Sequence, residues 1–227
     1  MLVKREVLLY NNAYLGDSMN EYFKTLNLLP TSRVIKEMRK YAENNKVPII
    51  NDETLLFFLH LIDLMKPKKM LEIGTAIGFC AISIATYDGD ILIDSIEKNE
   101  TLFSLAVNNV RKAKLDDRIN LFLGDAAELE LEKLNPEYDI IFIDGAKAQY
   151  VNYFERYEKL LSEEGVIISD NLLFHGFVNN KKIIESRNLL HLVEKIEAYN
   201  SYLARNRNFD TKFFGIDDGI AISRRKK

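Results

Sequence analysis

The sequence predicts a doubly wound α/β fold in which a seven-stranded, mostly parallel sheet lies between layers of helices. From residue 69 to residue 169, apolar runs of strand length alternate with helical stretches. The runs ILIDSI, YDIIFI and GVIIS are apolar almost throughout, as expected of strands that helices cover on both faces. Near the end of the chain, the short turn Asp217-Asp218-Gly219 separates two further apolar runs and predicts an antiparallel C-terminal hairpin.

Length and composition set the frame for these elements. The chain has 227 residues, of which 47% are hydrophobic and 29% charged, so we expect one domain over 1–227, with a helical N-terminal extension (1–66) and a core (67–227). The single cysteine, Cys80, excludes an internal disulfide framework and favours a reducing cytosol. Because no membrane-span or signal-peptide pattern is found, we expect a cytoplasmic protein without a membrane partner.

The N-terminal extension reads as three helices. Residues 17–45 predict two of them, with Asp17 or Ser18 as the first cap and Pro30-Thr31-Ser32 as the separator. Asp52 is expected to cap the third, ETLLFFLHLIDLM. Its apolar residues cover most of the helix circumference, which predicts burial on more than one side.

The core then follows the alternating pattern. Strands are expected over 69–73, 91–96, 119–123, 138–143 and 165–169, with helices over 78–87, 99–113, 126–134 and 148–161. A loop at 172–181 and a long helix over 184–206 precede the two closing strands, TKFFGI and GIAISRR.

The stretch KMLEIGTAIGFC (69–80) predicts a cofactor-binding loop. Gly74 and Gly78 allow a sharp turn and a close approach of the backbone to a ligand. Their G-x-x-x-G spacing differs from the G-x-G-x-x-G dinucleotide fingerprint, which argues against a nicotinamide dehydrogenase and favours a nucleoside-type cofactor. The alternative is a tight strand-to-helix turn without a ligand.

Acidic residues stand at or near the carboxyl ends of all five expected parallel strands, where open α/β sheets bind ligands. They are Glu72, Glu97, Asp125, Asp144 and Asp170. Glu97 is placed to accept both hydroxyls of a ribose, or to cap the following helix. Asp125 with Ala126 lies where an adenine edge would be, or caps a helix. Glu72 contacts the ligand or clamps the backbone.

A second group of residues predicts a metal site. Asp144, Asp170 and Asn171 offer hard oxygen ligands to an octahedral cation such as Mg²⁺ and leave positions open for a substrate. A hydroxyl bound there would have a lowered pKa, and Lys147 is close enough in sequence to assist its deprotonation. The alternative for each acid alone is capping of a strand end.

Five motifs in order carry a family resemblance: LEIGTAIGFCAISIA, SIEKNE, GDAAEL, YDIIFIDGAKAQYVNYF and GVIISDNLLFHG. Together they resemble the cation-dependent class I methyltransferases of the catechol and caffeoyl-CoA O-methyltransferase group, over roughly residues 47–225. The resemblance implies a Rossmann-like class I methyltransferase fold with 67–227 as its catalytic core, S-adenosylmethionine as methyl donor, and a homodimer.

The resemblance also implies residue roles. Glu72, Gly74, Thr75 and Gly78 would hold the methionine part of the donor, Glu97 the ribose, and Asp125 and Ala126 the adenine, while Ile50 would contribute a backbone contact at the pocket mouth. Asp144, Asp170 and Asn171 would bind the cation, and Lys147 would deprotonate the acceptor. Cys80 stands where many relatives place a serine that binds the donor carboxylate, and a thiol donates a weaker hydrogen bond.

Within this family, VPII, LDDRI, DNLLFHGFV and the ending GIDDGIAISRRKK look most similar to bacterial tRNA 5-hydroxyuridine methyltransferases. The implied partner is the tRNA anticodon region. Residues 181–227 hold eleven Lys and Arg but six Asp and Glu, and we expect RNA contacts from this basic third. The candidates are Lys181, Lys182, Arg187, Arg205, Arg207, Arg224, Arg225, Lys226 and Lys227.

Two rival functions remain at this point. A small-molecule catechol or phenylpropanoid O-methyltransferase would share the catalytic residues and need no basic tail. A non-catalytic cofactor-binding or RNA-binding module is the other, and the intact set of Asp144, Lys147, Asp170 and Asn171 argues against it.

Overall fold

The computed structural model describes residues 21–227, which are built around one seven-stranded sheet with strand order β3-β2-β1-β4-β5-β7-β6. The strands are β1 (Lys69–Ile73), β2 (Leu92–Glu97), β3 (Ile119–Leu123), β4 (Tyr138–Ile143), β5 (Leu161–Ser169), β6 (Phe209–Phe214) and β7 (Ile220–Arg225). β1 to β5 pair in parallel, and β7 runs antiparallel to both β5 and β6. The predicted doubly wound sheet with its closing hairpin is therefore confirmed.

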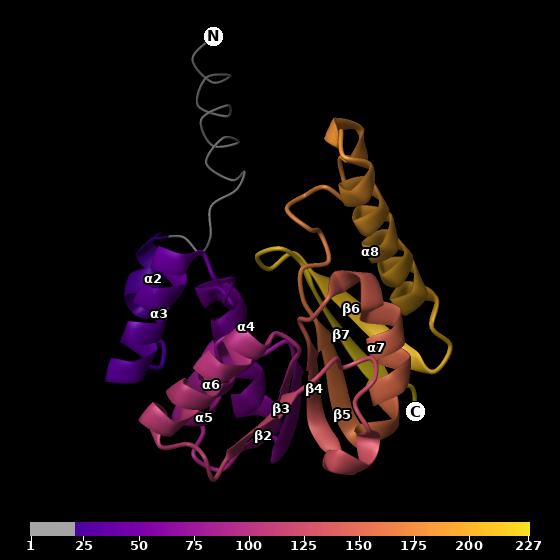
Figure 1. Cartoon of the computed structure of the whole chain (residues 1–227). Coiled ribbons are helices and arrows are strands. Elements are labelled where there is room, and N and C mark those ends of the chain that lie inside the picture. Colours follow the sequence, from indigo (N-terminus) through magenta and orange to yellow (C-terminus); the bar gives the residue numbers. More distant parts are fainter. Residues whose placement is uncertain (1–20) are drawn as a thin grey trace.

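Helices cover both faces of this sheet (Figure 1). The α-helices of residues 21–227 are α2 (Glu21–Leu26), α3 (Arg33–Asn45), α4 (Asp52–Met65), α5 (Phe79–Tyr87), α6 (Glu100–Ala113), α7 (Tyr150–Tyr157) and α8 (Arg187–Arg205). All of them except α2 contribute side chains to the core on one face of the sheet or the other. Four short 3-10 turns complete the set, at Leu131–Lys133, Lys147–Gln149, Glu158–Leu160 and Lys181–Ile183. Among the helices in residues 21–227, none combines the length and apolar character needed to cross a membrane.

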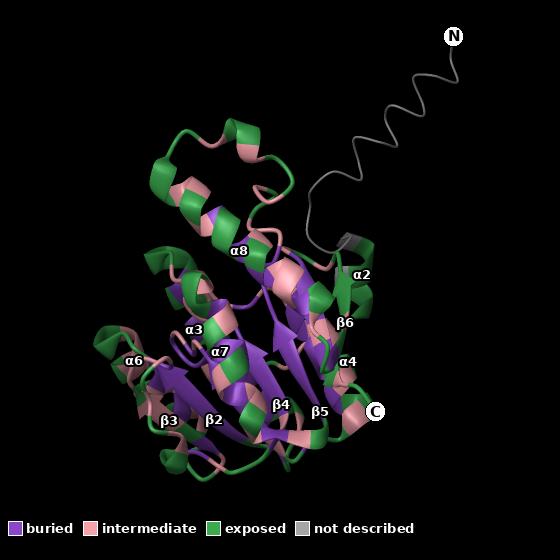
Figure 2. Cartoon of the chain, turned by 90° about the vertical axis from the view of Figure 1, so that its right-hand side faces the viewer, coloured by how far each residue is buried: buried purple, intermediate pink, exposed green. Residues whose placement is uncertain are grey.

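Alternation along the strands divides the core in two. Met70, Ile140 and Phe142 pack with α3, α4, α5 and α6, whereas their neighbours Leu71 and Ile141 pack with α7 and α8. All five side chains are almost fully buried. Figure 2 shows the resulting buried sheet between partly exposed helices. A strand that is buried on both faces needs a continuous apolar run, which is the pattern on which the prediction relied.

Two predicted caps have different outcomes in the N-terminal region. Asp17 and Ser18 lie outside the described residues. Pro30-Thr31-Ser32 separates α2 from α3 as predicted, and Ser32 caps α3. The expected cap of α4 was wrong by one residue: Asn51 Oδ1 accepts hydrogen bonds from the backbone amides of Glu53 (2.9 Å) and Thr54 (3.0 Å), so Asp52 is the first helical residue.

The helix predicted over 126–134 was wrong. The chain forms a turn after Asp125 and then the 3-10 turn at Leu131–Lys133. Glutamate and leucine alternate here, so Leu129 and Leu131 both pack against the sheet without the 3.6-residue repeat that an amphipathic helix requires.

Other boundaries moved for local reasons. The long helix begins at Arg187 rather than at 184, because Ser186 accepts a hydrogen bond from the Leu189 amide and caps it. α7 ends at Tyr157, and β5 starts four residues earlier than the predicted strand, at Leu161.

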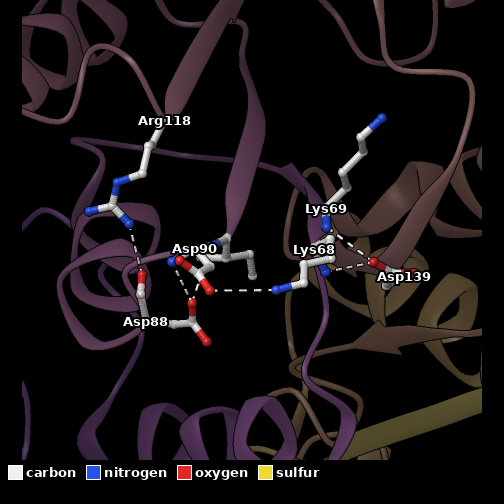
Figure 3. A network of polar contacts seen from close by, with 7 residues as sticks. Lys68, Lys69, Asp88, Asp90, Arg118 and Asp139 are labelled. Atoms are coloured by element: carbon white, nitrogen blue, oxygen red, sulfur yellow. Dashed lines mark hydrogen bonds and ion pairs between the residues drawn. The ribbon is translucent and has the colours of Figure 1, made fainter.

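A polar network closes the amino end of the sheet (Figure 3). Asp139, at the start of β4, accepts hydrogen bonds from the backbone amides of Lys68 (2.7 Å) and Lys69 (3.1 Å). Lys68 Nζ lies 3.6 Å from Asp90 Oδ2, and Arg118 donates to the carbonyl of Asp88 (2.8 Å). These charged groups therefore connect the starts of neighbouring strands.

Candidate active site

A cavity of about 490 Å³ opens at the other end of the sheet, beyond the carboxyl ends of the parallel strands. Its walls come from the segment before α4, the glycine loop, and the segments that follow β2, β3, β4 and β5. Predicted site residues among its lining are Ile50, Gly74, Glu97, Ala126, Asp144, Lys147, Asp170 and Asn171. The fold thus gathers at one place most residues that the sequence placed at a ligand site.

The glycine loop packs directly against the segment that carries the acids. Gly74 has φ of +101°, and a Cβ built on it would lie 2.4 Å from the carbonyl oxygen of Asp144. Gly78 has φ of +83° and is the N-cap residue that precedes α5. Asn109 of α6 donates to the carbonyl of Ile77 (2.9 Å) and holds the loop from outside. Only glycine fits position 74, and the loop lines the cavity at Gly74 and Ala76, where its backbone can approach a bound ligand closely.

Glu72 lies beneath this loop rather than on the wall of the main cavity. Its carboxylate accepts hydrogen bonds from the hydroxyls of Thr75 (2.7 Å) and Ser95. Burial raises the pKa of Glu72, and burial together with the nearby Glu72 carboxylate raises the pKa of the Cys80 thiol. Glu72, Thr75 and Cys80 line a small adjoining cavity, so the structure places them as support under the loop.

Glu97 fastens two loops together at the cavity wall. Its two carboxylate oxygens accept hydrogen bonds from the backbone amides of Ala76 (2.9 Å) and Asn99 (2.8 Å). Each oxygen keeps a second lone pair, so the carboxylate can also accept hydroxyl groups from a ligand in the cavity. Helix capping falls to Asn99, whose side chain accepts from the Leu102 amide.

Asp125 and Ala126 are placed differently from one another. Ala126 lines the cavity, together with Gly124, whereas Asp125 is not part of its lining. Asp125 Oδ1 accepts a hydrogen bond from the Ala127 amide (2.9 Å), which is the capping role that the sequence left open, here in a turn instead of a helix.

The acids after β4 and β5 meet in the cavity. Lys147 Nζ lies 3.0 Å from Asp144 Oδ1. The backbone N–H of Asn171 donates a hydrogen bond to Asp170 Oδ1 (2.7 Å). Tyr150 fixes the backbone of Asp170 by donating to its carbonyl (3.1 Å). Desolvation raises the pKa of Asp144 and, with repulsion from Asp144, raises the pKa of Asp170 to about 7.

This arrangement fits a divalent cation. The partly exposed carboxylate of Asp144 and the buried carboxylate of Asp170 have one neighbouring ammonium group, that of Lys147, so one of the two negative charges is left uncompensated when both acids are ionised. Within residues 21–227, no cluster of three or more His, Cys, Asp or Glu side chains is placed to hold a metal. The candidate metal ligands are therefore the carboxylates of Asp144 and Asp170 and the side-chain amide oxygen of Asn171. These three ligands leave the other coordination positions of the cation to water or substrate oxygens.

Among the lining residues that the sequence did not assign to the site are His175, Asp217 and Asp218. The His175 amide donates to Asp218 Oδ1 (2.6 Å), and the amides of Leu173 and Leu172 donate to the carbonyls of Asp218 (2.8 Å) and Gly219 (3.0 Å). The strand pairing of the sheet explains why Asp217 and Asp218 lie at the cavity. Because β7 pairs antiparallel with β5, the start of β7 must lie beside the carboxyl end of β5.

Comparisons with known proteins agree with this geometry. The sequence model of the O-methyltransferase family matches residues 27–226. A caffeoyl-CoA O-methyltransferase of Populus kitakamiensis is 29% identical over 222 residues, covering 92% of this chain and 94% of the relative. A Staphylococcus aureus protein provisionally described as a caffeoyl-CoA O-methyltransferase has a crystal structure with TM-score 0.82 and 40% identity, covering 86% and 93% of the two chains.

A further solved structure shares the fold. The O-methyltransferase of Bacillus cereus, in complex with SAH, has a TM-score of 0.77 and 23% identity and covers 91% of this chain and 96% of its own.

Proposed function

This chain belongs to the O-methyltransferase family, and we propose that its acceptor is the 5-hydroxyl group of uridine at the tRNA wobble position. Its chemistry is that of an S-adenosylmethionine-dependent O-methyltransferase of the caffeoyl-CoA type. The observation that carries the proposal is the pair of acids, Asp144 and Asp170, in the cavity beside Lys147, because it suits an acceptor with two adjacent oxygens. The 5-hydroxyl and the ring O4 of 5-hydroxyuracil form such a pair, as the two hydroxyls of a catechol do.

We propose Mg²⁺ or a similar cation as the second cofactor. Asp144, Asp170 and Asn171 would hold it, because carboxylate and amide oxygens are its preferred ligands. When bound, the cation would lower the pKa of the acceptor hydroxyl. The uncompensated charge described above is the property of this chain that supports the assignment.

The remaining roles, binding of the donor and removal of the acceptor proton, fall to side chains and backbone groups of this chain. Lys147 lines the cavity within reach of Asp144 and assists removal of the hydroxyl proton. The glycine loop holds the methionine part of the donor, and Glu97 accepts its ribose hydroxyls while fixing the loop through the Ala76 amide. S-adenosylmethionine supplies a sulfonium methyl group, whose carbon–sulfur bond breaks as the bond to the acceptor oxygen forms. The protein's contribution is mainly to hold these groups in line.

Support for a tRNA acceptor comes from the sequence. The motifs of the 5-hydroxyuridine branch and the excess of five positive charges over residues 181–227 favour a polyanionic partner. The rival acceptor is a small catechol or phenylpropanoid, and the relatives favour it by name, since they include a caffeoyl-CoA O-methyltransferase and a flavonoid 3',5'-methyltransferase of Vitis vinifera.

Homodimeric assembly in the cytoplasm also remains a proposal. The α4 and β6 surfaces meet where Phe57 packs on Phe214, with ring centroids 5.6 Å apart, and Phe214 on β6 and Leu64 at the end of α4 are both exposed apolar side chains. Light scattering during size-exclusion chromatography measures the assembly directly. A monomer over the whole accessible concentration range would contradict it.

One experiment separates the two acceptors. Labelled S-adenosylmethionine is supplied with Mg²⁺ or with a chelator, to total tRNA that carries 5-hydroxyuridine and, in parallel, to a panel of catechols. We expect cation-dependent label in tRNA. Label confined to catechols would transfer the same residues to the small-molecule function, and label in tRNA that the chelator leaves unchanged would contradict the cation.

A further inference from the structure

We infer that the outer face of α8, and not the C-terminal tail, is the surface that binds the RNA backbone. This inference rests on the proposed tRNA function and deepens it, because it selects four of the nine basic residues that the sequence could not rank and adds Lys195, which the sequence analysis did not name. The α8 surface, as we call it, consists of Lys182, Arg187, Lys195, Arg205 and Arg207.

Helical spacing brings the cations of α8 to one side. Arg187, Lys195 and Arg205 are separated by eight and ten residues, and His191, Ala198 and Tyr202 fill the steps of three and four between them. The opposite side of α8 is buried against the sheet through Val193, Ile196, Tyr199 and Leu203. The stripe therefore faces outward along the whole helix.

The length of the stripe suits an extended polyanion better than a small molecule. From Arg187 to Arg205 the helix rises about 27 Å, which corresponds to several successive phosphates of one strand. The first turns of α8 stand clear of the sheet, with exposed residues, beside the loop that leads from the cavity (Figure 2). Lys182 and Arg187 lie at that end, where the segment that leaves the cavity at Asn171 and His175 joins α8.

The side chains of the α8 surface are open to a partner. All five residues are exposed, and among the described residues none forms an ion pair or hydrogen bond with their charged groups. One acid interrupts the stripe: Glu194 lies on the same side, 3.8 Å from His191 Nδ1. At the far end, Arg205 and Arg207 border an open hollow of about 510 Å³, which Ser201, Tyr202 and Asn206 supply with hydrogen-bonding groups.

The remaining basic candidates are already engaged within the protein. Arg224 and Lys227 both pair with Glu164, the latter at 3.0 Å. Arg225 donates to the carbonyl of Glu158 and lies 5.2 Å over the ring of Phe209. Lys226 donates to the Asn206 carbonyl (3.0 Å), and Lys181 pairs with Glu197 (2.5 Å). RNA binding by these groups would have to break existing contacts.

The test compares two variants that lose the same charge. The first is Arg187→Gln/Lys195→Gln/Arg205→Gln on α8, and the matched control is Arg224→Gln/Lys226→Gln/Lys227→Gln in the tail. Binding of a synthetic anticodon stem-loop RNA is followed by fluorescence anisotropy over a range of salt concentrations. Melting temperature and calorimetric binding of S-adenosylhomocysteine report whether the fold and the donor site are intact in both variants.

We expect the α8 variant to bind RNA about tenfold more weakly than the wild type. The steepness of the plot of log affinity against log salt concentration should fall by about two, because each lost phosphate contact reduces the slope by about 0.7 to 0.9. The tail variant should stay within about twofold of the wild type. Equal weakening of both variants would indicate a general charge effect and overturn the inference. Wild-type-like binding by the α8 variant would also overturn it. Failure of the wild-type protein itself to bind or methylate RNA, with catechol methylation retained, would instead refute the tRNA function on which the inference rests.

Discussion

The two ends of the sheet carry acids of the same type in different surroundings. At the amino end, Asp139 accepts two backbone hydrogen bonds, and Asp90 lies beside Lys68 (Figure 3). At the carboxyl end, Asp144 and Asp170 line one cavity close enough to repel one another, and they share a single lysine. The first arrangement connects strands, whereas the second holds charge for a ligand. Position at a strand end alone therefore does not identify a functional acid; its partners do.

The sharpest test of this contrast exchanges charge for amide at each end. Asp170→Asn should lower methyl transfer by about a thousandfold, because the cation loses a charged ligand, while the melting temperature without cation should stay or rise since a buried charge is removed. Asp139→Asn should leave turnover within about twofold. Initial rates and melting curves for both variants decide the matter. Equal losses of turnover would remove the distinction between the two ends.

The lysines of the two ends allow a second comparison. Lys147→Met should lower turnover by about a hundredfold, the usual contribution of a positioned proton acceptor, without changing donor affinity. Lys68→Met should be nearly silent, because an exposed ion pair contributes about 0 to 1 kcal/mol. Single-turnover rates, with donor binding measured by calorimetry, separate the two effects. Full turnover by Lys147→Met would rule out its proposed role.

Glycine positions extend the comparison to the backbone. Gly74→Ala forces a Cβ against the Asp144 carbonyl at a positive φ, so we expect about tenfold weaker binding of S-adenosylhomocysteine and a lower melting temperature. Gly89→Ala, near the amino end, meets no atom within 4 Å and should change neither quantity. Calorimetric titration measures the affinity. Normal binding by Gly74→Ala would show that the loop relaxes away from Asp144.

The smallest expected effect is a pH dependence. The pKa of Asp170 is raised to about 7 in the folded protein, against about 3.9 in an unfolded chain. Between these values the folded state binds the extra proton, so this group lowers stability as pH rises from about 4 to about 7. A cation needs the ionised form, and the rise in melting temperature caused by Mg²⁺ should be larger at pH 8 than at pH 6. An equal rise at both values would contradict the coupling.

The fold could be predicted from the sequence because buried parallel strands need continuous apolar runs. The meeting of Asp144, Asp170 and Asn171 at one cavity could be predicted because parallel strands end at the same edge of a sheet. Prediction from the sequence failed where the outcome depends on neighbours distant in sequence. The alternation of glutamate and leucine within 126–134 led to the prediction of a helix, whereas Leu129 and Leu131 pack against the core from a turn and a 3-10 turn. Asp217 and Asp218 were missed because only the pairing of β7 with β5 brings them to the cavity, and His175 was missed because its place there depends on the hydrogen bond between its backbone amide and Asp218.

The charge count of the C-terminal third shows the same limit. It identified an excess of basic residues but could not show that Arg224 and Lys227 pair with Glu164, whereas Arg187 and Lys195 face outward. Composition reports how many cations a segment carries, and the fold decides which of them are free to bind.

The hydrogen bonds between the segment after β5 and the β6–β7 turn have a practical consequence for engineering. Leu172, Leu173 and His175 all donate from the backbone to Asp218 or Gly219, so these two segments form one interlocked unit. The glycine loop, by contrast, is built against Asp144 on the other wall. A library of variants aimed at new acceptors should therefore change residues 173–178 and 215–218 together, because the two segments are hydrogen-bonded to each other. The glycine loop, which is proposed to hold the donor, should be left unchanged.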